Sequence, residues 1–235
     1  MTTTDPTTIS PALVPVTLDL YRDIHKGIRA ELFAVTSEAG SLDPSQGIAR
    51  AALANHVRDM VTLLVSHAEH EDAAIQPALE QHLPELAQRI EVDHLTIEAR
   101  MQDLLELAGE AAALAAPDAG WRVHRLYVEL SAFTGAYLEH QDVEERVVMP
   151  ALERTIGVDA VVGIHQAILG AIPPDEMARS LAIMLPAMNV DDRAGLLGGM
   201  QAGAPAEVFD GVWSLARSVL DPADVQPLAS RLGIA

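Results

Sequence analysis

Two segments of the chain carry the same chemically active side chains at the same spacing. In each segment a histidine is followed by a glutamate four residues later and a proline six residues after that: His67, Glu71 and Pro77 in the first, and His140, Glu144 and Pro150 in the second. Four residues are about one turn of an α-helix, so the imidazole and the carboxylate of each pair share one helix face. Each segment therefore presents a two-point clamp for a metal ion.

The elements that carry these clamps follow from the apolar pattern. Apolar residues recur at spacings of three and four, which predicts long helices over residues 16–38, 46–82, 84–115 and 120–155. The pattern of the second helix matches that of the fourth at a constant offset along the sequence, and the first matches the third at a constant offset of its own. Such an internal repeat indicates a doubled helix pair.

Two further histidines occupy equivalent places in this repeat. His25 lies on the predicted first helix and His94 on the third, and the offset that superposes the two helices also superposes these two histidines. Each half of the chain thus supplies one histidine from its first helix and one His-Glu pair from its second. In a bundle these six polar side chains would meet at one level of an otherwise apolar interior.

The predicted fold is all-α: an up-down-up-down four-helix bundle over residues 16–157, because short links force neighbouring helices to run antiparallel. Residues 1–15 are rich in Thr and Pro and are expected to be a disordered tail without the features of a signal peptide. Residues 158–235 show short helices that begin at proline and acidic residues. We expect this extension to pack on the bundle or to form a partner interface, including one that makes a homodimer.

The polar layer requires a counter-charge. A buried carboxylate costs on the order of several kcal/mol unless it is paired. The apolar stripes of the helices that carry Glu71 and Glu144 contain no Lys or Arg to pair with them. Four imidazoles and two carboxylates suit two divalent ions such as iron, manganese or zinc. The absence of cysteine from the sequence excludes thiolate zinc sites and iron–sulfur clusters.

The order and spacing of these residues resemble the hemerythrin-like (HHE cation-binding) domain over roughly residues 16–155. The resemblance implies a hemerythrin-like bundle with two non-haem iron ions, bridged by oxo or hydroxo and carboxylate groups. It also implies that six residues are the ligands, with the two glutamates as bridges: His25, His67, Glu71, His94, His140 and Glu144.

One position departs from the oxygen-carrying hemerythrins. They have a fifth histidine four residues after the one on the third helix, and this chain has Glu98 there. A harder oxygen donor favours the ferric state and disfavours reversible oxygen carriage. The sequence leaves open whether Glu98 binds or supports the metal, or simply faces solvent.

Three more side chains stand near the predicted metal layer. His70, three residues after His67, is expected to support a ligand or to lie at the surface. Tyr21 lies four residues before His25, and Tyr137 lies three residues before His140. Because the two helices run in opposite directions, the tyrosines flank the predicted layer on opposite sides. They are either core aromatics, or phenols that donate a hydrogen bond to a bound oxygen species or carry a radical.

The function indicated by these patterns is that of a di-iron protein that binds and activates a small oxidant such as dioxygen, hydrogen peroxide or nitric oxide. Two alternatives remain open at this point. One is a binding module that senses iron or oxygen through its C-terminal helices without turnover, and the other is a di-iron oxidase or oxygenase of a pathway. Catalysis is therefore undecided, and an enzyme would be an oxidoreductase of the peroxidase or oxidase type.

Charge and hydropathy limit the other partners. The net charge is −19, and no segment concentrates Lys and Arg into a patch, which disfavours nucleic acid and anionic membranes. No apolar run reaches the roughly eighteen residues of a membrane span. A cytoplasmic location is expected.

Overall fold

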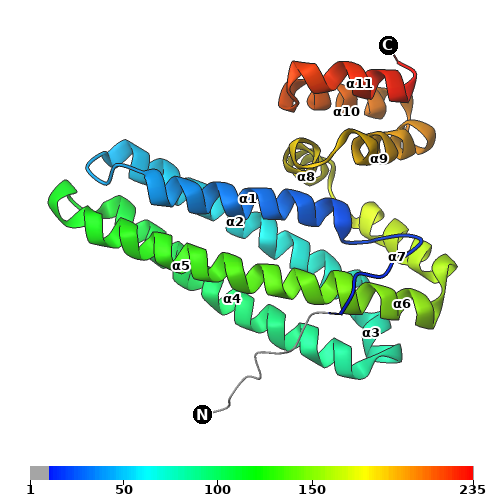
Figure 1. The fold of residues 1–235 in the computed structure, drawn as a ribbon, viewed down its shortest axis with the longest axis horizontal. Helices are drawn as coiled ribbons and strands as arrows, with labels where there is room; N and C mark the ends of the chain where they lie inside the picture. The colour runs from blue at the N-terminus through cyan, green and yellow to red at the C-terminus, as the bar shows by residue number, and fades with distance from the viewer. Residues whose placement is uncertain (1–10, 235) are drawn as a thin grey trace.

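Four long helices form the bundle in the computed structural model, which describes residues 11–234. They are α1 (Arg22–Ser41), α2 (Gly47–Ala74), α4 (Pro84–Ala113) and α5 (Ala116–Val143). Contacts between α1 and α2, α2 and α4, α4 and α5, and α5 and α1 close a ring of helices. Figure 1 shows these four helices side by side along the bundle. Over residues 11–234 the chain forms helices and no strand, so the predicted all-α class is confirmed.

The interior of the bundle is built from the predicted seams and divides into two apolar clusters. The larger cluster includes Leu64, Ile97 and Tyr137, and the smaller one includes Tyr21 and Ile75. Burial of a side chain of this size stabilises the fold by roughly 1.5–3 kcal/mol relative to leaving it exposed. Along each long helix and the residues next to it, the predicted metal ligands lie between residues of the larger cluster and residues of the smaller one. Apolar layers therefore close the polar layer from both ends.

The first helix begins later than predicted. The expected start was residue 16, but α1 starts at Arg22. Asp19 Oδ1 accepts hydrogen bonds from the backbone amides of Tyr21, at 3.0 Å, and Arg22, at 3.1 Å. Such local bonds offer the backbone an alternative to helix, so residues 16–20 form a non-helical approach to α1.

The predicted second helix is interrupted just after its glutamate. It divides at Ile75 into α2 and α3 (Gln76–His82), with Pro77 in the first turn of α3. Proline has no amide hydrogen to donate and clashes with the preceding turn, so a continuous helix would be strained there.

The predicted fourth helix begins earlier than expected and is interrupted within its range. It begins at Ala116, not at residue 120, because Pro117 fits the first turn of a helix. After α5 the chain passes through a π-helical turn, η1 (Glu144–Val148), into α6 (Met149–Ile156). The amide of Met149 bonds to the carbonyl of Glu144, five residues back, just before Pro150. The repeated prolines thus coincide with an irregular turn after each glutamate.

The C-terminal helices form an array with its own apolar core. After α7 (Val158–Ala171), which contacts α2 and α6, come α8 (Pro174–Ala187), α9 (Val190–Gly203), α10 (Ala206–Val219) and α11 (Pro222–Leu232). Residues from α8 to α11 share one cluster, and α8 lies against α1 (Figure 1). Of the predicted tail, residues 1–10 lie outside the described residues, and residues 11–15 are exposed and not helical.

No helix within residues 11–234 combines the length and apolar character that crossing a lipid bilayer requires.

The contact between α1 and α8 depends on a glycine. A Cβ atom at Gly27 would lie 3.2 Å from Cα of Met184, so the two backbones can approach this closely only without a side chain there. Next to it, Lys26 pairs with Asp192 at the start of α9. The C-terminal helices are therefore fixed to α1 close to His25.

The substitution Gly27→Leu should push α8 away from α1. We expect a loss of about 1–3 kcal/mol in unfolding free energy, the usual cost of overpacking. Gly135→Leu on α5 is the matched control, because a Cβ there meets nothing within 4 Å. Chemical denaturation of both variants checks this, and equal stability of the two would contradict it.

A histidine clamp joins α1 and α2 away from the metal residues. His56 Nδ1 contacts Glu38 Oε2, and Nε2 lies 2.8 Å from Glu31 Oε1, so both ring nitrogens face carboxylates. Burial lowers the pKa of His56, but the hydrogen bond to Glu38 and the charge of Glu31 outweigh it and raise this pKa above 6.5.

The stabilisation by His56 should consequently depend on pH. Because its pKa is raised by folding, the contribution is complete below pH 6.5 and is lost as pH rises through the folded-state pKa. The unfolding free energies of the wild type and of His56→Gln, measured by urea denaturation between pH 6 and 9, should converge as pH rises. A difference that stays constant or widens over this range would refute the clamp.

Candidate metal centre

The six predicted residues converge inside the bundle. Their ligand atoms fall into two groups, and within each group all atoms lie within 4.8 Å of one another. One group contains His25, His67 and Glu71, and the other contains Glu71, His94, His140 and Glu144. The shared glutamate makes one continuous centre of both groups.

Glu71 lies between histidines of two helices. Its Oε1 is 3.0 Å from Nε2 of His67 on α2, and its Oε2 is 3.5 Å from Nε2 of His94 on α4. Each oxygen therefore faces a different imidazole, as a carboxylate that bridges two ions must.

Glu144 repeats this arrangement from the opposite side. Its Oε1 is 3.1 Å from Nε2 of His140, and its Oε2 is 3.4 Å from Nε2 of His25. Only 1% of the Glu144 side chain is exposed. Glu144 is also the first residue of the π-helical turn, so the irregular turn begins at a predicted metal ligand.

The donor set fits metal ions. Both oxygens of Glu71, Oε2 of Glu144 and Nε2 of His94 are buried and have no hydrogen-bond partner among residues 11–234. Unpaired buried polar atoms of this kind destabilise a fold, and a cation between them would remove the penalty. Burial raises the pKa of Glu71, but the attraction of His67 outweighs it and holds this pKa well below 4.5, so the group is an ionised carboxylate.

Two further carboxylates hold the outer nitrogens of the histidines. Nδ1 of His25 is 2.9 Å from Oε1 of Glu145, and Nδ1 of His94 is 2.9 Å from Oδ1 of Asp72. A hydrogen bond to the outer nitrogen fixes the ring and leaves the other nitrogen for metal. Sequence reasoning missed both acids, although each directly follows one of the two glutamates and they are therefore equivalent in the repeat.

The histidine of α5 has a looser outer contact. Nδ1 of His140 lies 3.8 Å from Oδ2 of Asp93, which is too long for a hydrogen bond, and this buried nitrogen has no partner.

Glu98 and His70 lie outside the two groups. Glu98 is exposed on α4. His70 places Nδ1 3.5 Å from Oε1 of Glu176 on α8, so it faces the C-terminal helices.

The two tyrosines stand beside the histidines. The ring centroid of Tyr21 is 5.2 Å from that of His25, and Tyr137 is 5.8 Å from His140. Burial raises the pKa of both phenols well above 10.0, and the nearby glutamates raise it further. Both side chains are therefore neutral phenols that can donate a hydrogen bond.

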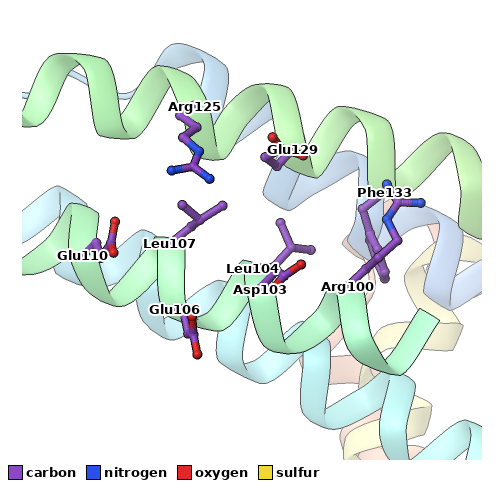
Figure 2. Close-up of a pocket in the computed structure, with 9 residues that line it drawn as sticks. All are labelled: Arg100, Asp103, Leu104, Glu106, Leu107, Glu110, Arg125, Glu129 and Phe133. Carbon is purple, nitrogen blue, oxygen red and sulfur yellow. The ribbon is translucent and has the colours of Figure 1, made fainter. Parts of the chain in front are cut away.

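A surface groove of about 260 Å³ lies between α4 and α5 (Figure 2). Its lining combines Arg100 and Arg125 with several acidic side chains, and Arg100 lies 5.6 Å from the centre of the Phe133 ring. The ring centroid of Phe133 lies 5.8 Å from that of Tyr137. The groove contains none of the six metal residues and is separate from the centre.

The comparison with protein families agrees with this geometry. The family model described as the hemerythrin HHE cation binding domain matches residues 16–152. No curated protein and no solved structure matches the chain. The family match spans more than half of the sequence and covers all six predicted metal ligands. The chain therefore belongs to the hemerythrin HHE cation-binding domain family.

Proposed function

We propose that the chain holds two iron ions and binds a small oxidant at them. The observation that carries this proposal is that Glu71 and Glu144 each lie between two histidines of different helices. One ion would take His25 and His67, the other His94 and His140, and both glutamates would bridge the pair.

The donor set supports both parts of the proposal. Imidazole and carboxylate suit iron, and they also accept manganese or zinc. Two imidazoles and two shared carboxylates would leave each ion short of six ligands, and dioxygen, peroxide or nitric oxide would bind at the open place. Ferrous ions supply electrons to such a molecule when they are bound.

The residues around the centre determine how an oxidant is handled. The two apolar clusters keep bulk water away, which strengthens every electrostatic interaction inside. Tyr21 and Tyr137 provide neutral phenols that donate hydrogen bonds to a bound molecule. Glu98 is exposed and therefore does not add a fifth ligand side chain to the four histidines from the place where the oxygen-carrying hemerythrins have a histidine.

Elemental analysis and absorption spectra test this function. Protein loaded with ferrous ion under anaerobic conditions should contain about two irons per chain, and air should produce new oxidised-iron absorption. The double variant His67→Ala, His140→Ala should lose both signals. His165→Ala on α7, outside both groups, should retain them. An iron-free wild type, or iron retained by the double variant, would disprove the assignment.

Metal should also stabilise the bundle. An ion that binds only the folded chain adds about 2.7 kcal/mol to the unfolding free energy when its free concentration is 100 times its Kd. Manganese titrated during thermal unfolding should raise the Tm of the wild type and of Glu98→Ala, but not that of Glu144→Ala. An equal shift in Glu144→Ala would show that the stabilising ion lies elsewhere.

A sensing role is the second candidate, and a specific contact favours it. Glu176 of α8 accepts a hydrogen bond from Ser66, and its Oε1 lies 3.5 Å from Nδ1 of His70. Ser66 and His70 lie on either side of His67 in the sequence. Changes at the metal position of His67 would therefore be transmitted directly to the C-terminal helices.

Hydrogen exchange distinguishes the sensor from the enzyme. If the chain is a sensor, oxidising the loaded protein should change amide exchange in α8 at least about threefold, while the far end of α4 stays unchanged, because α8 touches the metal-bearing helices. Substituting Glu176→Gln should weaken this response. Unchanged exchange in α8 together with turnover of peroxide would exclude sensing through these helices.

A further inference from the structure

The two metal positions are matched in their ligands but not in the charges behind them. The repeat that makes His25 equivalent to His94 also makes Arg29 equivalent to Glu98, since each lies four residues after its histidine. The place that a cation occupies in one half of the repeat is thus occupied by an anion in the other.

At the position of His25 and His67, the outer nitrogen of His25 has a firm support. Glu145 Oε1 lies 2.9 Å from Nδ1 of His25 and accepts a hydrogen bond of 2.8 Å from Arg29 Nη1. The Glu145 side chain is only 19% exposed. Arg29 holds this carboxylate in place and balances its charge.

The position of His94 and His140 has a weaker support. Asp72, which bonds Nδ1 of His94, is 54% exposed, so water competes for its oxygens. Glu98 occupies the place in the repeat that Arg29 occupies in the other half. His94 is also more accessible than His25, at 11% against 0% of the side chain.

Outer support of this kind changes metal affinity. The hydrogen-bonded carboxylate orients the ring and raises the basicity of the ligating nitrogen, and its loss typically weakens metal binding by about 10–100-fold. The better supported pair of histidines is therefore expected to bind its ion more tightly.

We propose, resting on the two-ion function above, that the positions fill in order. The ion at His25 and His67 binds first, and the ion at His94 and His140 binds second and at least about tenfold more weakly. Arg29 is the positioning residue that creates this difference, because the other half of the repeat has Glu98 in its place. At limiting metal the chain then carries one ion, and the position beside Asp72 is the one that exchanges.

Calorimetric titration of the metal-free full chain with Mn²⁺ tests the order. The wild type should show two steps that differ by about tenfold or more, and Glu98→Arg should reduce the difference to about threefold by giving Asp72 a partner. Arg29→Gln should weaken the first step. Glu106→Arg, the same charge reversal at an exposed site further along α4, should leave both steps unchanged.

Ligand variants assign the steps to positions. His94→Ala should retain the tight step, and His25→Ala should lose it, with thermal unfolding confirming that each variant is folded. Two equal steps in the wild type, the opposite assignment, or the same effect from Glu98→Arg and Glu106→Arg would overturn the proposed order. Failure of the wild type to bind two ions would instead refute the two-ion function itself.

Discussion

The structure depends on two carboxylates, Glu71 and Glu144, that are buried among histidines from four helices. Glu71 and Glu144 lie in an apolar interior, and three of their four oxygens lack hydrogen bonds. Such a layer is costly on its own, and bound ions would offset this cost. The bundle is organised around this polar layer, with apolar clusters closing it from both ends.

The repeat explains how one chain builds a nearly symmetric centre. Each glutamate begins or precedes an irregular turn, at Ile75 in one half and through the π-helical turn in the other. Each is followed by an acid that reaches the histidine of the opposite half, Asp72 to His94 and Glu145 to His25. The two halves therefore complete each other's sites, and neither pair of helices would hold a whole position alone.

Helical periodicity predicted which side chains share a face, and so the pairing of His67 with Glu71 and the seams of the core. It did not predict features that depend on contacts remote in the sequence or on local backbone competition. Glu145 supports His25 from the other half of the repeat. Gly27 lies against the backbone of Met184 on α8, which is distant in the sequence. The late start of α1 follows from hydrogen bonds of Asp19 that periodicity does not reveal.

An anomalous difference map at the iron edge, from crystals of the full chain grown with excess ferrous ion without oxygen, tests the central claim most directly. The account predicts two peaks per chain, one beside His25 and His67 and one beside His94 and His140, both in contact with Glu71 and Glu144. A single peak, or peaks that do not touch these glutamates, would contradict it.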